Sequence, residues 1–284
     1  MLNYEQINSL SNAYIKSKIY EILKEDIPTF DFTTLACINE NSESTAIIEA
    51  VEDLVFVGKN IIKNFFDEKS NVNVFFEDGD YVYKNSIIAT IDGNTREILS
   101  KERSMLNLIQ RLSGIATITR KYVELASPYN VKILDTRKTT PLLRLFEKYA
   151  VNKGGGYNHR LDLSSAILIK DNHIKGATNL ALAINSAKRY NLNIEVEAEN
   201  LEQIKEICKH KINGILLDNM NRDLTLESVK YIRNIYTKDE VYIISSGGIN
   251  LKNINNYLDT GIDGISIGAL THSVKSSDIR LELK

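Results

Sequence analysis

The chain has 284 residues, of which 43% are hydrophobic and 25% charged, and its formal net charge is −2. This length suits one large α/β domain or two smaller ones, and the near-neutral charge argues against a general nucleic-acid binder. No apolar run approaches the roughly 18 residues of a membrane span, and no basic-then-apolar leader opens the chain. Cys37 and Cys208 lack metal or disulfide spacing. We therefore expect a soluble cytoplasmic protein with no nucleic-acid or membrane partner.

The first part of the chain reads as a small α+β region. Apolar residues at helical spacing predict an amphipathic helix over residues 3–24, which Pro28 follows. Short strands separated by turn signals are expected between about residues 44 and 100. Residues 96–126 read as a long helix interrupted near Ser113 and Gly114, which would join the two halves. The last residues, 274–284, alternate like a strand and could return to the first domain.

From about residue 130, short apolar runs alternate with segments of helical composition. This rhythm favours a parallel sheet covered by helices, either a barrel or a doubly wound layer. Polar or glycine residues follow six successive runs, at 135–138, 170–172, 195–199, 218–219, 245–248 and 268. A barrel builds its site from such strand ends along one rim, whereas a doubly wound sheet concentrates them at one switch point. We therefore prefer a (β/α) barrel, which could be incomplete.

The stretch VNKGGGYNHR, residues 151–160, places three of the chain's 14 glycines just before His159 and Arg160. One interpretation is a flexible surface loop. The other is a loop whose backbone comes close to an anion that His159 and Arg160 face. These ten residues by themselves do not choose between the two.

Positive charge gathers around this stretch, with eight Lys or Arg against three Asp or Glu between residues 137 and 175. Arg137, Lys138 and Lys170 follow predicted strands, where a parallel barrel opens. Arginine gives forked contacts to carboxylate or phosphate, and lysine gives a point charge. A rim that carries both indicates a small substrate with several negative charges.

Glu197 and Asp218 lie at the ends of two later strands. Two carboxylates facing a cationic pocket suit Mg²⁺ or sugar hydroxyls, with ordinary solvated or salt-bridged carboxylates as the alternative. Glu195 and Glu199 share the strand parity of Glu197, so parity alone does not choose among the three. The last two strands end in glycine-bearing turns, which in barrels commonly cradle phosphate. The candidates there are Ser246, Gly248, Gly268 and His272.

The block LDTRKTTPLLRLFEKYAVNKGGGYNHRLDLSSAILIKDNHI, residues 134–174, closely resembles the signature of the quinolinate phosphoribosyltransferase family, also called nicotinate-nucleotide pyrophosphorylase (carboxylating). The blocks ERSMLNLIQRLSGIAT, IEVEAENLEQ, LLDNM, SSGGIN and SIGALTHS match the family's other blocks in the right order. The resemblance covers most of the chain, from EDIPTFDFTT to THS, and the long block is highly specific.

The resemblance implies a fold, a reaction and an assembly. The fold is α/β, an open (β/α) barrel (residues 113–272) preceded by a smaller α+β sandwich-like N-terminal domain (residues 1–112, which residues 273–284 could join). The substrates are quinolinate and phosphoribosyl pyrophosphate, the cofactor is Mg²⁺, and the products are nicotinate mononucleotide, pyrophosphate and CO₂, as in de novo NAD biosynthesis. The assembly is a homodimer or higher homo-oligomer whose site lies at the subunit interface.

The resemblance also assigns roles residue by residue. Two arginines and a histidine would bind the two carboxylates of quinolinate, two lysines would complete the cationic pocket, and two carboxylates would hold Mg²⁺ and the ribose. The expected catalytic residues are Lys138, Lys170, Glu197 and Asp218, of which the last two are the metal ligands. The expected substrate-binding residues are Arg103 (reaching into a partner's site), Arg137, His159, Arg160, Ser246, Gly248, Gly268 and His272.

The chain departs from the family pattern in three places. Phe30 and Leu142 stand where the family usually has glycine, and residues 152–153 stand where it has Arg-Cys. None of these changes removes a charged ligand, so they concern loop conformation and the N-terminal block.

Two alternatives remain: a paralogous phosphoribosyltransferase acting on another acceptor, and a binding or regulatory protein that kept the pocket without the activity. Substrate turnover separates them.

Overall fold

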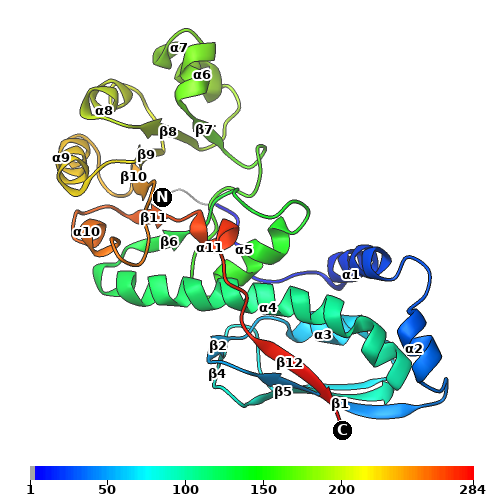
Figure 1. Cartoon of the computed structure of the whole chain (residues 1–284). Coiled ribbons are helices and arrows are strands. Elements are labelled where there is room, and N and C mark those ends of the chain that lie inside the picture. Colours follow the sequence, from blue (N-terminus) through cyan, green and yellow to red (C-terminus); the bar gives the residue numbers. More distant parts are fainter. Residues whose placement is uncertain (1–3) are drawn as a thin grey trace. The chain divides into compact units, whose positions relative to one another are not determined.

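The computed structural model describes residues 4–284, which form two compact units (Figure 1). The antiparallel unit comprises residues 7–120, 142–155 and 274–284, and the parallel unit comprises residues 121–141, 156–273 and the described N-terminal residues 4–6. This division differs from a single cut after residue 112. Helix α4 (Thr95–Ala126) continues through that point, and residues 142–155 belong to the antiparallel unit rather than to the barrel.

The antiparallel unit contains a four-stranded sheet of order β12-β1-β5-β3 and a separate pair, β2 and β4. Its strands are β1 (Glu43–Ala50), β2 (Leu54–Val55), β3 (Asn71–Val74), β4 (Tyr81–Val82), β5 (Ile87–Asn94) and β12 (Ile279–Leu283). Its helices are α1 (Asn12–Asp26), α2 (Phe32–Cys37), α3 (Lys59–Phe65), most of α4, and α5 (Arg144–Lys153). The last strand of the chain pairs antiparallel with β1, from Ala46 opposite Leu283 to Ala50 opposite Ile279.

The first helix is shorter than its apolar spacing predicts. The Ser11 hydroxyl accepts a hydrogen bond from the Tyr14 amide at 3.2 Å, and α1 begins immediately after this cap. Residues 4–11 are not helical, and residue 3 lies outside the described residues. The expectation of a helix from residue 3 is therefore wrong, because the polar groups of the first residues are engaged elsewhere, as described below.

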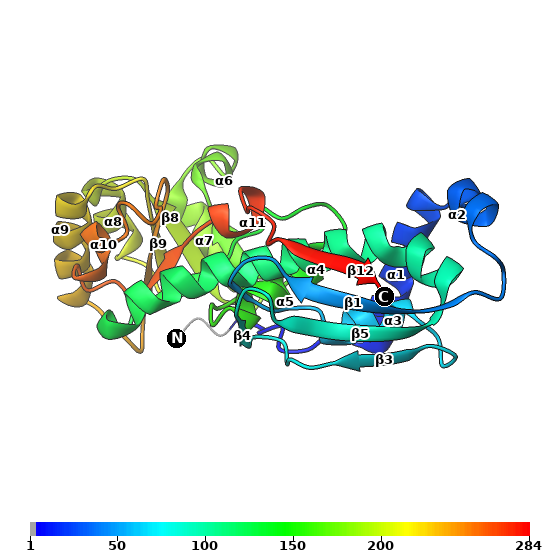
Figure 2. The same cartoon turned by 60° about the horizontal axis from the view of Figure 1, so that its bottom comes forward.

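Helix α4 is continuous, so the expected interruption near Ser113 and Gly114 is also wrong. The helix lies along one face of the antiparallel sheet (Figure 2), and the Ser113 hydroxyl accepts from the Val57 amide at 3.1 Å. Close packing explains the glycine at position 114 instead. A Cβ at Gly114 would lie 2.3 Å from the carbonyl oxygen of Lys275, because the chain that leads to β12 crosses the helix there.

The first two of the three consecutive glycines serve packing and a turn. Gly154 caps α5, and a Cβ there would lie 2.6 Å from the carbonyl oxygen of Ala116 on α4. Gly155 has a φ of 92°, a conformation that favours glycine. The stretch is therefore not a loose surface loop, and an approaching anion is not needed to explain these two glycines.

The parallel unit is an open barrel of six parallel strands in the order β6-β11-β10-β9-β8-β7. The strands are β6 (Lys132–Leu134), β7 (Ile167–Ile169), β8 (Ile194–Ala198), β9 (Gly214–Asp218), β10 (Tyr242–Ser246) and β11 (Gly264–Ser266). Strands β7 to β11 follow one another in sequence order, as in a barrel, and β6 is added beside β11. A closed barrel would also pair β6 with β7, but these two are the edges of the sheet. The predicted α/β fold, an open barrel with a smaller second domain, is confirmed.

Short helices precede, connect or follow these strands, and most of them lie outside the sheet (Figure 1). They are η1 (Ser127–Tyr129), α6 (Asp171–Gly176), α7 (Leu180–Lys188), α8 (Leu201–Ile207), α9 (Arg222–Arg233), α10 (Asn255–Leu258) and α11 (Ala269–His272). Asparagine side chains cap α7, α8 and α9, each accepting from an amide in the first turn. Within residues 4–284, no helix has the length and apolar character needed to cross a membrane.

Alternate residues of the strands point into the barrel. Leu134, Leu216, Tyr242 and Ile244 form a buried cluster there, with Tyr4 and Leu168 packed against it. The strand register pairs Leu216 with Glu197 on one side and with Ile244 on the other, so Glu197 shares the inward face. The apolar layer therefore lies directly beneath the polar strand ends.

Substituting Gly114 by alanine tests the crossing of α4 by the C-terminal segment. We expect Gly114→Ala to lower the free energy of unfolding by about 2 kcal/mol, because the backbone of residue 275 must move to admit the methyl group. Gly176→Ala is the matched control, since a Cβ there meets no atom within 4 Å, and it should change stability by less than about 1 kcal/mol. Urea unfolding of both variants measures this. Equal effects would contradict the packing explanation.

Candidate active site

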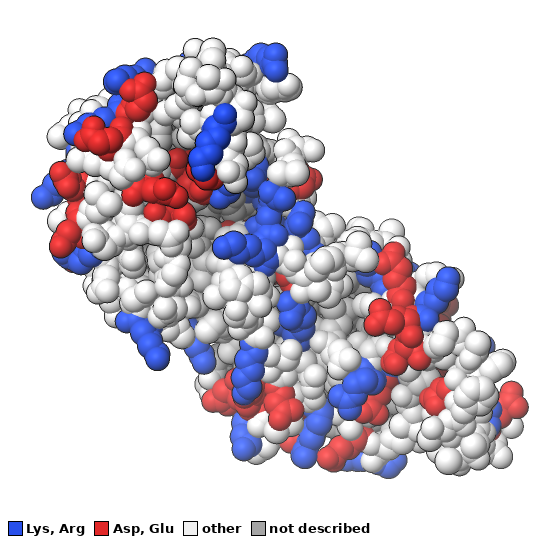
Figure 3. All heavy atoms as spheres, turned by 45° about the horizontal axis from the view of Figure 1, so that its top comes forward, with Lys and Arg blue, Asp and Glu red and all other residues white. Residues whose placement is uncertain are grey.

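The carboxyl ends of the parallel strands carry most of the residues that the sequence singles out. Since all six strands run in one direction, their ends meet at one rim of the open barrel. Figure 3 shows Lys and Arg atoms close to Asp and Glu atoms on the face of this unit that it presents. The predicted residues at the strand ends or in the turns that follow are Arg137, Lys138, Lys170, Glu197, Asp218, Ser246, Gly248, Gly268 and His272.

Lys170 and Glu197 form an ion pair at this rim. Lys170 follows β7 directly, and its ammonium group donates to Glu197 Oε2 on β8. The Lys170 side chain is 42% exposed, whereas that of Glu197 is 9% exposed. The lysine is therefore free to move toward a ligand, but the carboxylate is held in place.

Glu197 and Asp218 are close enough to influence each other. Burial raises the pKa of Glu197 above its ordinary value, Lys170 opposes this change, and the negative charges of Asp218 and Asp171 add to it. A cation placed between Glu197 and Asp218 would relieve this repulsion. No cluster of three or more His, Cys, Asp or Glu suited to a metal is present among residues 4–284. Two carboxylates nevertheless suit Mg²⁺, which commonly takes its other ligands from substrate phosphates and water.

Arg137 and Arg160 bring two positive charges together. Arg160 is 7% exposed, and its Nη1 donates to the carbonyl of Ala166 at 3.1 Å. Burial, and then the charge of neighbouring Arg137, lower the pKa of Arg160. Arg137 Nε is buried without a hydrogen-bond partner among the described residues. Two adjacent guanidinium groups with unused donors have the chemistry suited to an anion with carboxylate or phosphate oxygens.

The segment after the glycines binds to the edge of β6. Tyr157 pairs with the strand through two backbone hydrogen bonds, its amide to the carbonyl of Ile133 at 2.8 Å and its carbonyl from the amide of Asp135 at 3.0 Å. The fully buried Asp135 carboxylate then accepts from the Asn158 side chain at 2.7 Å and from the His159 amide at 2.8 Å. The position of the His159 backbone is therefore set by Asp135, a residue without an assigned role in the sequence analysis.

His159 contacts a carboxylate of the protein itself. Its Nε2 lies 3.0 Å from Oε2 of Glu195, which is fully buried on β8. Burial by itself would raise the pKa of Glu195, but the charge and hydrogen bond of His159, with a hydrogen bond from Tyr4, outweigh it and leave the pKa below its ordinary value. Strand parity placed Glu195 and Glu197 on one face, and burial separates them. Glu195 lies in the interior, and Glu197 lies nearer the rim.

The two turns after β10 and β11 hold the glycine candidates. Gly247 has a φ of 94°, and a Cβ there would lie 2.2 Å from Asn219 Oδ1, so the turn after β10 packs against the end of β9. Gly248 also has a positive φ, of 62°, but open space surrounds its missing side chain. Gly268 is the N-cap of α11, and a Cβ there would lie 3.0 Å from Lys138 Cδ and 3.1 Å from the His272 ring. The structure therefore brings Lys138, Gly268 and His272 together.

Arg103 belongs to a different unit from the other predicted site residues. It is on α4 in the antiparallel unit, its side chain is 66% exposed, and its nearest acid is the adjacent Glu102 at 3.9 Å. The other predicted site residues all belong to the parallel unit.

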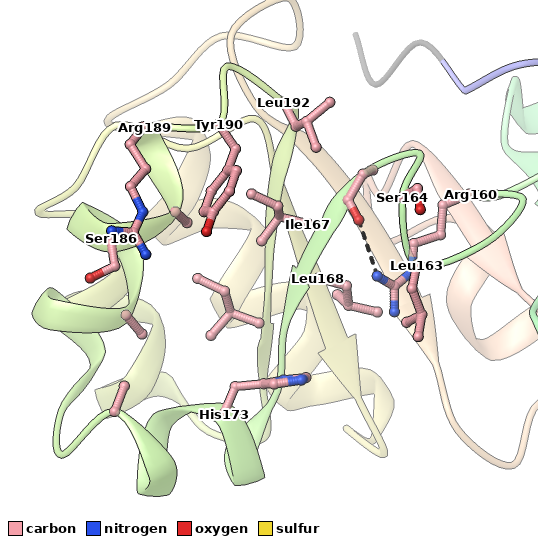
Figure 4. A pocket seen from close by; sticks show the side chains of 15 residues that line it. Arg160, Leu163, Ser164, Ile167, Leu168, His173, Ser186, Arg189, Tyr190 and Leu192 are labelled. Atoms are coloured by element: carbon pink, nitrogen blue, oxygen red, sulfur yellow. Dashed lines mark hydrogen bonds between the residues drawn. The ribbon is translucent and has the colours of Figure 1, made fainter.

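The parallel unit also has a hollow of about 630 Å³ above β7, between α6, α7 and the loop after Arg160 (Figure 4). Arg160 lines one end, where its guanidinium bonds to Ala166, and Tyr190 and Arg189 line the α7 side. Most of the remaining wall consists of Ala, Leu and Ile side chains. It contains none of the other predicted site residues, so we place the candidate site at the charged rim rather than in this hollow.

Models of two protein domains match nearly the whole chain. The quinolinate phosphoribosyl transferase N-terminal domain matches residues 31–113, and the C-terminal domain of the same family matches residues 115–282. This chain belongs to the quinolinate phosphoribosyltransferase family. The probable nicotinate-nucleotide pyrophosphorylase [carboxylating] of Bacillus subtilis is 41% identical over 281 residues, covering 96% of this chain and 95% of its own.

Other members of the quinolinate phosphoribosyltransferase family give the same result. The protein of the same name from Methanocaldococcus jannaschii is 39% identical, covering 95% of this chain and 98% of its own. The structure of the nicotinate-nucleotide pyrophosphorylase from Francisella tularensis superposes with a TM-score of 0.92 at 37% identity, covering 99% of this chain and all of that one.

Two departures from the quinolinate phosphoribosyltransferase pattern have a visible structural setting. Leu142 has a φ of 67°, the left-handed conformation that glycine adopts most easily, and its side chain is 75% exposed. Asp31, after the exposed Phe30, caps α2, because its carboxylate accepts from the Thr34 amide at 3.0 Å and from Ser100 Oγ at 3.0 Å. Asp31 therefore has a local structural role in the N-terminal block.

The lowered pKa of Glu195 predicts how the stability of the protein changes in acid. Its pKa in the folded protein lies below the ordinary value of 4.5, so the unfolded chain takes up the proton first as the pH falls. The stabilisation is complete above about pH 4.5 and disappears as the pH falls through the folded value. We expect Glu195→Gln to cost about 3 kcal/mol at pH 7 and progressively less below pH 4.5.

Urea unfolding of both proteins between pH 7 and pH 3 measures this difference. Glu202→Gln is the control, because the Glu202 side chain is 81% exposed and its replacement should change stability by less than about 0.5 kcal/mol. A gap between wild type and Glu195→Gln that does not depend on pH would contradict the lowered pKa of Glu195 in the folded protein.

Proposed function

We propose that this chain transfers the phosphoribosyl group of phosphoribosyl pyrophosphate to quinolinate, with decarboxylation. The observation that carries the proposal is the rim of the open barrel, where Arg137 and Arg160 bring two positive charges together and Glu197 and Asp218 form a carboxylate pair. Quinolinate is a dianion whose two carboxylates need forked cationic partners. The curated relatives bear names for this reaction. No observation favours the paralogous transferase that acts on another acceptor.

The reaction needs positioning more than it needs a protein nucleophile. The pyridine nitrogen of quinolinate attacks C1 of the ribose, the bond from C1 to pyrophosphate breaks, and the ring becomes a cationic nucleotide. The 2-carboxylate then leaves as CO₂, and a proton replaces it to give nicotinate mononucleotide. Because the transition state of the first step carries positive charge on the ribose, fixed charges and orientation account for most of the acceleration.

The cationic residues hold the acceptor in this proposal. Arg137 and Arg160 bind its carboxylates, and the unused Arg137 Nε is one donor. His159 adds an aromatic, polar wall whose orientation is fixed by Glu195 and Asp135. Lys170 exchanges its contact with Glu197 for a substrate oxygen, which its exposure allows. Lys138, beside Gly268 and His272, is placed to meet phosphate oxygens.

The carboxylate pair binds the donor in this proposal. Glu197 and Asp218 would hold Mg²⁺ and the ribose hydroxyls, and bound Mg²⁺ would supply charge neutralisation for the pyrophosphate. Ser246 is the last residue of β10 and is opposite Asp218 in the register, and Gly248 lies in the turn that follows. Their place at the rim is consistent with a phosphate-binding turn.

The proposal includes an assembly of more than one chain. Arg103 is exposed on the antiparallel unit, as a residue that acts in another subunit must be before assembly. We propose a homodimer or higher homo-oligomer in which Arg103 completes a partner's site. Sedimentation equilibrium should give at least twice the chain mass of 32.1 kDa, and a monomer at assay concentration would contradict this part.

Turnover with alternative acceptors tests the function directly. Purified protein, phosphoribosyl pyrophosphate and Mg²⁺ are incubated with quinolinate or, in parallel, with nicotinate, and products are followed by mass spectrometry. We expect nicotinate mononucleotide and CO₂ from quinolinate, loss of the reaction when Mg²⁺ is omitted, and no turnover of nicotinate, which lacks the 2-carboxylate. Turnover of nicotinate alone would identify a different transferase, and no product from either acceptor would favour the paralogue.

Replacing Arg160 tests the carboxylate contact. Arg160→Ala should lower kcat/KM for quinolinate by about 30- to 1000-fold, equivalent to roughly 2–4 kcal/mol, because a buried carboxylate of the substrate loses its partner. Arg189→Ala is the matched control. Arg189 lines the same hollow as Arg160 but lies at the end of α7, away from the rim, so its loss should change kcat/KM less than twofold. An unchanged kcat/KM in Arg160→Ala would remove this residue from the site.

A further inference from the structure

The first described residues of the chain belong to the parallel unit, although residues 7–120 that follow them do not. The Gln6 side chain and the Asn158 backbone exchange two hydrogen bonds. The Gln6 side-chain amide donates to the Asn158 carbonyl at 3.0 Å, and the Asn158 amide donates to Gln6 Oε1 at 2.8 Å. The N-terminal segment is therefore joined to the residue just before His159.

Tyr4 reaches the buried interior from this segment. Its hydroxyl donates to Glu195 Oε2 at 2.5 Å, the same oxygen that lies 3.0 Å from His159 Nε2. The Tyr4 ring also lies against the His159 ring, with centroids 4.5 Å apart and planes tilted by 38°. Tyr4 thus contacts His159 twice, directly through its ring and indirectly through the shared carboxylate oxygen.

The hydroxyl of Tyr4 has a clear electrostatic role at this position. Burial, and then the negative charge of Glu195, raise the pKa of Tyr4, so the side chain stays neutral and acts as a donor. Glu195 Oε1 is buried and has no hydrogen-bond partner among residues 4–284. Without the Tyr4 hydroxyl, His159 would be the one hydrogen-bond partner left to the carboxylate among residues 4–284, and nothing else in this group would fix the plane of the carboxylate.

We propose that Tyr4 is a positioning residue that holds His159, through Glu195, in the orientation required for binding the acceptor. The N-terminal segment would then contribute to the site through its contacts with Glu195 and His159. The identity of the acceptor rests on the proposed function, whereas the contact of Tyr4 with His159 does not.

A purely structural explanation for Tyr4 is that its ring fills the barrel interior, since it packs against the cluster of Leu134, Leu216, Tyr242 and Ile244. The two explanations differ in what the hydroxyl does. Packing needs only the ring, which phenylalanine retains. Positioning needs the hydrogen bond to Glu195, which phenylalanine lacks. Tyr4→Phe therefore separates them without creating a cavity.

Quinolinate binding provides the first test. Tyr4→Phe should weaken the Kd of quinolinate, measured by calorimetry, by about five- to tenfold, as expected when a buried charged acceptor loses one donor. The kcat and the KM for phosphoribosyl pyrophosphate should change less than twofold. Tyr20→Phe is the matched control, because Tyr20 is 67% exposed on α1, and all of its parameters should match the wild type. Uniform changes in every parameter of Tyr4→Phe would show a merely structural role.

A double-mutant cycle with His159→Gln then tests the route of the effect. If Tyr4 acts through His159, Tyr4→Phe should have no further effect on the Kd of quinolinate once His159 is glutamine. If the two effects on the Kd multiply, Tyr4 acts independently of His159 and the proposal is overturned. Thermal unfolding of each variant confirms that the proteins compared are folded.

The imidazole NMR spectrum keeps the inference testable if quinolinate is not the acceptor. The chain has four histidines, so the His159 ring signals can be assigned by their loss in His159→Gln. At one fixed pH, Tyr4→Phe should shift the His159 ring signals and leave those of the other three in place. Unchanged His159 signals would overturn the positioning role whatever the substrate. Failure of the turnover assay with a shifted His159 signal would instead overturn only the proposed acceptor.

Discussion

The arrangement of the site depends on a parallel sheet that curves like a barrel but does not close. Its two edge strands, β6 and β7, expose backbone groups that need partners. On β6 the partner is Tyr157, so the chain that leaves α5 is held along this edge. His159 and Arg160 follow immediately, and they therefore lie at the carboxyl end of the sheet. The cationic side chains of this segment therefore lie on the open side of the barrel.

Buried charge is the second constraint. Asp135 and Glu195 are both fully buried, and a buried carboxylate is tolerated only when charges or donors surround it. Asp135 uses the Asn158 side chain and the His159 backbone, and Glu195 uses the His159 ring and the Tyr4 hydroxyl. Each carboxylate therefore holds the same short segment from a different direction. The position of His159 is therefore set by two interior interactions rather than by the loop that carries it.

Like charges are kept together at the rim, which is costly without a ligand. The charge of Arg137 disfavours the protonated form of Arg160, and Asp218 disfavours the ionised form of Glu197. Binding an anion at the first pair and a cation at the second would remove both repulsions. Repulsion between neighbouring like charges is typical of functional sites, because the folded protein holds these groups in place for the ligand that binds them. The apolar layer of Leu216 and Ile244 beneath keeps the strand ends in register.

The residues at the strand ends were predictable because side-chain direction and strand polarity are local properties. Apolar runs, each followed by Asp, Glu, Arg, Lys or Gly, were enough to predict a barrel rim and to nominate Asp218, Arg137 and Lys170. The choice of Glu197 over Glu195 and Glu199 came from the family resemblance. Gly114 shows the limit of such reasoning. A glycine within a helical pattern indicated an interruption, but the reason for it lies in the carbonyl of Lys275, which is distant in sequence.

The sequence by itself determined the class of fold, the order of its elements and the chemistry available at the rim, because these follow from periodicity, polarity and a motif of high specificity. Only the tertiary structure decided which of Glu195 and Glu197 lies buried against His159 and which faces the rim, since both share one strand face and depth is set by neighbouring strands. It alone placed Tyr4 beside His159, because a contact between residues 155 positions apart in the chain depends on how the N-terminal segment packs into an open barrel.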